Sequence, residues 1–199
     1  MHQKTKVTTT TTTTKKQTTS QKGAPPQQQA QKELKTIPED KTTGVIRAAL
    51  KAHNEKRGLH GCPPLGFNED LAKLAKDWAE KLIQRNAFEH RPDNAYGENI
   101  YMRGGTSPIT DEQAVQNAVD SWYNEIKDYK LFGREPTMQE LMSGSPTGHF
   151  TQLIWKGTKA VGIGIAKGDQ NRVVVVANYS PAGNVVRYFN ENVPNVVKK

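Results

Sequence analysis

The sequence predicts an α+β domain in which helices pack on both sides of a small antiparallel sheet. Three observations carry this prediction: amphipathic helical periodicity from residue 44 to about residue 128, a strand–turn–strand pattern late in the chain, and a polar N-terminal segment. Helices come first along the chain and the hairpin comes last. Helices followed by a hairpin of this kind imply helices packed on both sides of the sheet.

The N-terminal segment, residues 1–43, differs in composition from the rest of the 199-residue chain. It holds eight Lys against three acidic residues, 13 Thr and seven Gln, no aromatic residue, and most of the formal net charge of +8. So few apolar side chains cannot offset the entropy of ordering the segment. We therefore expect a disordered Thr/Gln/Lys-rich tail at 1–43, a folded domain at 44–190 and a C-terminal tail at 191–199.

Composition disfavours several classes of protein. No run of 18 apolar residues occurs, so we expect no membrane-spanning helix. The N-terminus has no apolar segment of the kind found in secretory signal peptides, so we expect none. Cys62 is the only cysteine, which rules out an intrachain disulfide and a Cys-based zinc finger. Because most of the excess positive charge lies in the tail, we expect no nucleic-acid partner.

Two helices are predicted before residue 86. The first spans residues 44 to about 58, and its apolar face consists of Ile46, Ala49, Leu50 and His53, which makes His53 a core histidine. His60 follows in an expected loop and suggests no role. Asn68 is the predicted N-cap of the second helix. The apolar stripe of that helix contains Leu71, Leu74, Ala75, Trp78, Ala79, Leu82 and Ile83.

The middle of the chain alternates loops with regular elements. Residues 86–96 are an expected polar loop, and residues 99–102 an expected short strand. A third helix is predicted from the N-cap Thr110, which forms a capping box with Gln113, to about Asp128. Its buried stripe includes Trp122, with Glu125 at the margin. Residues 130–144 are an expected loop.

The last part of the chain predicts a short helix and a hairpin. Ser145 and Pro146 fit the N-cap and first position of a helix that carries His149 and Phe150. Residues 161–165 alternate in polarity, residues 168–171 form a turn, and residues 173–177 are continuously apolar. A continuous apolar run predicts a central strand covered on both faces. Tryptophans at helical spacings, Trp78, Trp122 and Trp155, are expected in the core.

No common phosphate, dinucleotide, zinc-protease or serine-hydrolase motif occurs in the sequence. The two best-placed titratable residues are Glu98, in the segment GENI, and His149, in the segment GHFTQ. Each stands in an otherwise apolar or glycine-flanked segment. Spacing alone does not distinguish a ligand from a buried, hydrogen-bonded group.

Five ordered motifs give the sequence a specific resemblance to a known family. Residues 148–158 read GHFTQLIWKGT and residues 177–185 read ANYSPAGNV; the supporting motifs are HNEKR at 53–57, GENI at 97–100 and WYNEI at 122–126. Together they resemble the CAP superfamily, which includes cysteine-rich secretory proteins, antigen 5 and pathogenesis-related proteins. The matching signature residues are Gly148, Phe150, Thr151, Gln152, Trp155, Asn178, Tyr179, Pro181, Gly183 and Asn184.

Within this superfamily the chain looks most like the Golgi-associated plant pathogenesis-related protein branch. Ala177 stands where secreted members carry a cysteine, and Cys62 has no possible partner in the chain. The resemblance therefore implies a disulfide-free member, which favours an intracellular place or the cytosolic face of a membrane. An extracellular location, as in most of the superfamily, is the alternative.

The resemblance implies a three-layer α-β-α sandwich with a cleft formed by His90, Glu98, Glu125 and His149. In some members the two histidines bind zinc or another divalent cation, so His90 and His149 are the expected metal ligands. A second interpretation makes the four residues a hydrogen-bonded polar cluster that fixes the cleft. His90 is the least firmly matched, since the loop before Glu98 varies in length among members.

Taken with the absence of an activated nucleophile, the resemblance predicts a non-enzymatic binding protein without catalytic residues. Its expected partners are a lipid, a sterol or an anionic membrane surface, or a protein, including a second copy as a homodimer. One alternative is a metal-assisted hydrolase or protease that uses Glu98 or Glu125 as the general base. Another is a secreted defence or signalling protein that acts through protein interaction.

Overall fold

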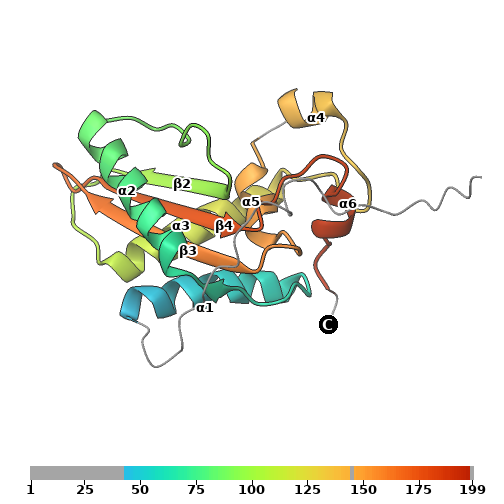
Figure 1. Ribbon diagram of the computed structural model, residues 1–199, viewed down its shortest axis with the longest axis horizontal. Coiled ribbons are helices and arrows are strands. Elements are labelled where there is room, and N and C mark those ends of the chain that lie inside the picture. Colours follow the sequence, from blue (N-terminus) through green and yellow to red (C-terminus); the bar gives the residue numbers. More distant parts are fainter. Residues whose placement is uncertain (1–42, 144–145, 198–199) are drawn as a thin grey trace, which may run out of the picture.

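The computed structural model describes residues 43–143 and 146–197, which form three layers (Figure 1). A four-stranded sheet lies in the middle, with α2 on one face and α1, α3 and α5 on the other. The helices are α1 (Gly44–Leu59), α2 (Glu69–Arg85), α3 (Asp111–Asn124), α4 (Met138–Ser143), α5 (Gly148–Ile154) and α6 (Phe189–Asn192). The strands are β1 (Gly66–Phe67), β2 (Gly97–Arg103), β3 (Ala160–Lys167) and β4 (Val173–Ser180). The predicted sandwich is confirmed.

The strands lie in the order β1-β3-β4-β2, with β4 between β3 and β2. Both neighbours of β4 run antiparallel to it, and all eight of its residues are buried. The prediction of a central strand covered on both faces is therefore confirmed. The two-residue strand β1 pairs parallel to β3, a pairing that no sequence pattern indicated because the strand is so short.

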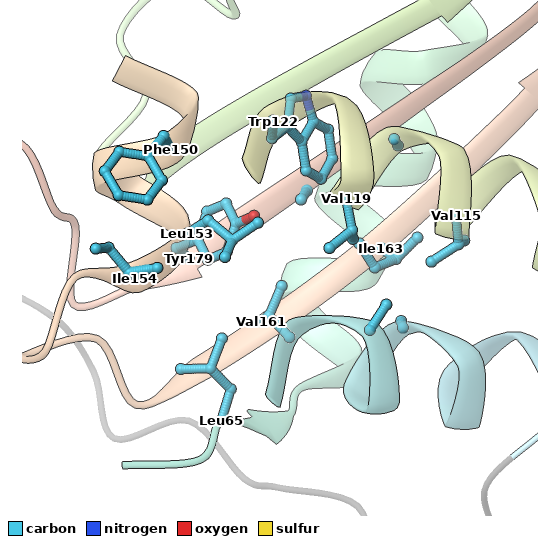
Figure 2. Packing of buried hydrophobic residues seen from close by; sticks show 14 of the residues in the cluster. Leu65, Val115, Val119, Trp122, Phe150, Leu153, Ile154, Val161, Ile163 and Tyr179 are labelled. Atoms are coloured by element: carbon cyan, nitrogen blue, oxygen red, sulfur yellow. The ribbon is translucent and has the colours of Figure 1, made fainter. Parts of the chain in front are cut away.

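Side chains of β4 alternate between two separate parts of the core. Val175 and Tyr179 belong to the cluster on the α1, α3 and α5 side. Figure 2 shows Tyr179 in this cluster together with Trp122. Val174 and Val176 belong to the other cluster, under α2. This division follows from the period of two in a strand. All three tryptophans are buried as predicted: Trp78, Trp122 and Trp155.

Glycines in β3 allow α2 to approach the sheet closely. A Cβ atom at Gly162 would lie 2.1 Å from the backbone nitrogen of Ala72, and one at Gly164 would lie 2.1 Å from that of Lys76. Neither contact is possible for a real Cβ atom, because helix backbone is the obstacle. The alternating polarity of β3 thus reflects glycines pressed against a helix rather than a face exposed to water.

Helix starts follow the capping residues that the sequence predicted. The Asn68 side chain accepts a hydrogen bond from the Leu71 backbone N–H at 3.0 Å. Thr110 and Gln113 form both hydrogen bonds of the capping box. The end of α3 differs from the prediction, because the α-helix stops at Asn124 and a 3₁₀ turn, Glu125–Lys127, follows it.

Three other expectations need correction. The predicted loop 130–144 contains α4, whose exposed side chains give no apolar stripe facing the core. The short strand β2 begins at Gly97, two residues before its predicted start. The helix α5 begins at Gly148 with Thr147 as N-cap, so Pro146 precedes it and is not its first residue. Ser145 lies outside the described residues.

The predicted tails are only partly within the described structure. Residues 1–42 lie outside it. Residues 191–197, expected as a tail, include the end of α6, and Val193 is buried. The backbone N–H of Val197 donates to the Leu59 carbonyl at 2.9 Å. Within the described residues, no helix has the length and apolarity that crossing a membrane requires.

Candidate functional site

Four side chains from distant parts of the chain meet as two hydrogen-bonded pairs. Nδ1 of His90 lies 2.9 Å from Oε1 of Glu98, and Nδ1 of His149 lies 2.6 Å from Oε1 of Glu125. The two imidazole ring centroids are 6.5 Å apart. The structure thus brings together all four residues that the resemblance implied, and we call them the His/Glu cluster.

Three members of the His/Glu cluster stand at an end of an element or next to one, and the fourth lies in a loop. Glu98 is the second residue of β2, Glu125 follows the last residue of α3, and His149 is the second residue of α5. His90 belongs to the loop between α2 and β2. The 3₁₀ turn that ends α3 begins at Glu125, so the turn that shortened the predicted helix also places this carboxylate beside α5.

Backbone groups hold both carboxylates in place. Oε1 of Glu98 also accepts from the Arg91 backbone N–H at 3.0 Å, and the Glu98 side chain is only 5% exposed. Oε2 of Glu125 accepts from the backbone N–H of Phe150 at 3.0 Å. Since each carboxylate is fixed by the main chain, each in turn orients the ring that it contacts.

The hydrogen bonds to the carboxylates define the state of the two rings. A carboxylate accepts, so Nδ1 of His90 and of His149 carries the proton, and a neutral ring keeps its lone pair on Nε2. Within the described part of the chain, neither Nε2 atom has a hydrogen-bond partner. The hydrogen bond that His90 donates to Glu98 raises the pKa of His90 above its ordinary value. His149 also stacks on Trp122, with ring centroids 6.3 Å apart.

The donor set decides what kind of cation could be held. Zinc sites in proteins use three or four protein ligands, whereas this arrangement offers two imidazole nitrogens. In residues 43–143 and 146–197, no three His, Cys, Asp or Glu side chains are grouped so as to hold a metal ion. The His/Glu cluster therefore fits an open cation site that is completed by water, and does not fit a closed structural zinc site.

A buried hydrogen-bond chain supports the cluster from behind. Asn99 donates through Nδ2 to the His149 carbonyl at 3.0 Å and to the Tyr179 hydroxyl at 3.3 Å. The Tyr179 hydroxyl lies 2.9 Å from Nε2 of His53, whose Nδ1 lies 2.8 Å from the Ala49 carbonyl. Burial lowers the pKa of His53 to about 4, so the ring is neutral and accepts from Tyr179. The predicted core position of His53 is confirmed.

Several signature residues brace α5 against the segment that follows β4. Gly183 donates through its backbone N–H to Oε1 of Gln152 at 2.8 Å. The Thr151 hydroxyl lies 2.6 Å from Oδ1 of Asn184, which donates through Nδ2 to the Gly148 carbonyl at 2.9 Å. These contacts fix the first turn of α5 and therefore the ring of His149.

The remaining signature residues fill the core or contact the cluster indirectly. Phe150 packs among aromatic rings and Trp155 packs edge-on against Phe189. Oδ1 of Asn178 accepts from Asn94, which also contacts Glu98. The carbonyl of Pro181 accepts from the Thr158 hydroxyl at 3.0 Å. None of these side chains completes a further chemical site.

Two residues that position α5 were missed by sequence reasoning. Arg57 is fully buried and donates through Nη1 to the carbonyls of Leu153 and Trp155, at the end of α5. His60, assigned no role, is 2% exposed, and its ring packs edge-on against Phe150 of α5 while Nδ1 lies 2.7 Å from the Pro194 carbonyl. Arg57 follows His53 by one helical turn, so its place on the apolar face was the available signal.

Comparisons with known proteins agree with the fold and with the signature residues. The model of the CAP family, the cysteine-rich secretory protein family, matches residues 50–179. Golgi-associated plant pathogenesis-related protein 1 of Homo sapiens is 38% identical over 149 residues, which cover 72% of this chain and 88% of that protein. Protein PRY2 of Saccharomyces cerevisiae is 34% identical, over 72% of this chain but only 39% of its own length.

Solved structures resemble the chain at the level of the fold. The crystal structure of NaASP2 with Zn²⁺ has a TM-score of 0.62 at 21% identity and covers 81% of this chain and 90% of its own. The structure of BmVAL-1 also has a TM-score of 0.62, at 24% identity, and covers 81% of this chain and 87% of its own. With the family match and the 38% identical relative, these findings show that the chain belongs to the CAP family.

Proposed function

We propose that the chain is a binding protein that holds a divalent cation, zinc in the first instance, at Nε2 of His90 and of His149. One observation carries the proposal: both rings donate through Nδ1 to an anchored carboxylate. The Nε2 lone pair of each ring is therefore available to a cation, and the two rings are neighbours. In metal sites, a carboxylate behind a histidine fixes the ring and raises its basicity as a ligand. Glu98 and Glu125 stand in that relation here.

The open donor set indicates what the cation would do. Two protein nitrogens leave several coordination positions to water, which an anionic or polar group of a partner could replace. Once bound, the cation would supply a concentrated positive charge at the protein surface. The crystal structure of NaASP2 with Zn²⁺ supports zinc as the first cation to test, although that protein shares only 21% identity with this chain.

The carboxylates fit a positioning role better than a catalytic one. Oε1 of Glu98 accepts two hydrogen bonds, and both oxygens of Glu125 accept one each. A general base needs a free oxygen within reach of a substrate proton. Cys62 offers no nucleophile, because the thiol is buried and burial raises its pKa. We therefore propose binding without catalysis.

Calorimetric titration with zinc tests the cation site. The full chain should bind one zinc ion, and His90→Ala and His149→Ala should each weaken binding by about tenfold or more, the loss typical of a removed ligand or its support. The matched control is His2→Ala, which removes a histidine outside the described residues and should leave binding unchanged. Equal binding by the full chain and His149→Ala would remove His149 from the site.

The hydrolase alternative has its own test. The full chain is incubated with mixed peptide and ester substrates, with and without zinc, and the same is done with Glu98→Gln. We expect no turnover in any of these reactions. Zinc-dependent turnover that disappears in Glu98→Gln would establish the hydrolase and overturn the proposal of a purely binding role.

A second proposed function, contact with a lipid surface, is favoured by the helix α4. Its apolar side chains are exposed: Met138 by 58%, Leu141 by 38% and Met142 by 82%. Clustered exposed apolar residues on one helix are typical of a surface that meets lipid or another apolar partner. We propose that α4 contacts the membrane, and that the basic segment 1–43 adds attraction to anionic lipid.

Liposome flotation separates the two contributions. Met138→Ser combined with Met142→Ser should reduce binding to both anionic and zwitterionic vesicles, whereas removal of residues 1–43 should reduce binding to anionic vesicles only. The second effect should vanish at high salt. Salt-insensitive binding that is unchanged by both alterations would contradict the proposed lipid contact at α4.

A further inference from the structure

The strand β3 is an edge strand over most of its length. β1 pairs only with Ala160 and Val161. Among residues 43–143 and 146–197, no other strand lies on that side of residues 162–167, while β4 pairs along the whole of the opposite side. Unpaired strand edges of this kind are sites at which a further strand can pair.

The direction of the backbone groups on β3 follows from its hydrogen bonds. The Val161 carbonyl accepts from the Asn68 backbone N–H at 2.9 Å. The backbone N–H and carbonyl of Val161 therefore point away from β4, toward the side of β3 that is open beyond β1. Backbone groups of a strand alternate in direction, and therefore Ile163 and Ile165 face the same side. Nζ of Lys76 donates to the Ile165 carbonyl at 2.6 Å. Within the described part of the chain, the N–H and carbonyl of Ile163 and the N–H of Ile165 have no partner on this side and can pair with a further strand.

A groove of about 660 Å³ runs along this open edge. Val45 and Ile46 of α1 form one wall, Ala72 of α2 contributes to the other, and Ile163 and Ile165 line the groove between them. Figure 1 shows α1 and α2 on either side of β3. The α2 side of the groove also carries charged side chains: Glu69, Lys73, Lys76, Asp77 and Glu80. Apolar side chains beside unpaired backbone groups are the combination that binds an extended peptide by strand addition.

The chain itself offers an occupant next to the groove. Thr43 is the first described residue and lines the groove, and 42 residues precede it. Residues 34–37 read LKTI and are followed by Pro38. Thr36 and Ile37 are of the types enriched in strands, and a proline is tolerated at the end of a strand but not within it.

The reach and the side-chain pattern of this segment match the groove. Thr43 follows Ile37 by six positions, which span up to about 20 Å when extended. The groove follows α2 from Glu69 to Glu80, eleven residues that rise about 16 Å. In a strand, Leu34 and Ile37 point to opposite faces, so one would meet the α1 wall and the other the α2 wall.

We propose that residues 34–37 add to the open edge of β3 as a fifth strand of the sheet. Because the segment is tethered to Thr43, its effective concentration at the groove exceeds that of a free peptide. The segment then covers the unpaired edge, which would otherwise be open to pairing with another chain.

Amide hydrogen exchange in the full chain, measured by NMR, tests the proposal. The amides of Ile163 and Ile165 should exchange about ten times more slowly in the unaltered chain than in Thr36→Pro, which cannot form the strand. The matched control is Thr18→Pro, the same substitution farther from the domain, which should behave as the unaltered chain. The Gly164 amide faces β4 and should not change in either variant.

Two outcomes would overturn the proposal. Equal exchange of Ile163 and Ile165 in the unaltered chain and in Thr36→Pro would mean that residues 34–37 do not cover the edge. Protection that survives Thr36→Pro and grows with protein concentration would assign the edge to a second copy.

A second measurement avoids disturbing the backbone. A nitroxide attached at Lys35→Cys should broaden the signals of Lys76 and Ile165, and one at Lys16→Cys should not. Cys62 is buried and is a poor competitor for the label. Equal broadening from both positions would also contradict docking of residues 34–37.

Discussion

The domain holds two pairs of histidines whose surroundings differ in one respect. In the interior pair, His53 and His60, both nitrogens of each ring have a partner. In the outer pair, His90 and His149, only Nδ1 has a partner among the described residues. A fully hydrogen-bonded imidazole stabilises a fold, whereas one with a free nitrogen can still bind a cation or a proton. The comparison thus separates structural histidines from proposed ligands.

The fold shifts the pKa values of the interior pair and of His90 in opposite directions. Burial lowers the pKa of His53 to about 4 and lowers that of His60. Glu98 raises the pKa of His90. As the pH falls, His90 therefore takes up a proton before His53 and His60, and these two interior rings resist protonation until the fold begins to lose stability.

The largest effect should come from removing an interior ring. His53→Ala leaves a cavity beside Trp122 and leaves the Tyr179 hydroxyl without its acceptor, so we expect a loss of about 4 kcal/mol in the free energy of unfolding. Urea denaturation measures it, with the exposed Lys51→Ala on the same helix as the control. A loss below about 1 kcal/mol would break the distinction between interior and outer histidines.

Acid should weaken the fold through the interior pair. A histidine whose pKa is lowered by folding stabilises the native state at pH values above the unfolded pKa, near 6.5, and this stabilisation is lost as the pH falls toward 4. For His53 the loss reaches about 3 kcal/mol at pH 4. Urea midpoints at a series of pH values should show this slope, and His53→Gln should flatten it. A slope that persists unchanged in His53→Gln would assign it to other groups.

Zinc should stabilise the fold only through the outer pair. At a zinc concentration of a hundred times Kd, the free energy of unfolding should rise by about 2.7 kcal/mol, since the cation binds the folded state. His149→Ala, which weakens binding by about tenfold or more, should cut the rise to about 1.4 kcal/mol or less. The effect should also fade as the pH falls through the raised pKa of His90, because the proton competes for Nε2. An undiminished rise in His149→Ala would place the zinc elsewhere.

The smallest effect should come from removing an outer ring without metal. The His90 side chain is 64% exposed, so His90→Ala should change the free energy of unfolding by no more than about 0.5 kcal/mol. Urea denaturation in the presence of a chelator measures this change. A loss as large as that of His53→Ala would make His90 a structural residue and favour the interpretation of the cluster as a brace.

Features fixed by neighbouring residues could be predicted from the sequence. The side chains of the caps Asn68 and Thr110 each accept a hydrogen bond from the backbone N–H three residues later. The continuous apolar run of β4 indicates a central strand without knowledge of its neighbours. The helix α4 could not be predicted, because Met138 and Met142 face outward and form no stripe toward the core.

Features fixed by distant residues needed the family resemblance or the structure. The spacing of Glu125 and His149 in the sequence does not indicate that they form a pair. They meet only because the helices α3 and α5 pack against each other and against β2. The buried position of His60 depends on Tyr123 and on Pro194, far along the chain. Helix packing, and not local pattern, decides which histidines keep a free nitrogen.

The imidazole nitrogens can be observed directly in the full chain by ¹⁵N–¹H correlation spectra of its five histidine rings during a zinc titration. We predict that the Nε2 signals of His90 and His149 shift together at one zinc per chain, while both nitrogens of His53 and of His60 stay in place. Zinc that leaves the signals of His90 and His149 unmoved would contradict the assignment of the outer pair as a cation site.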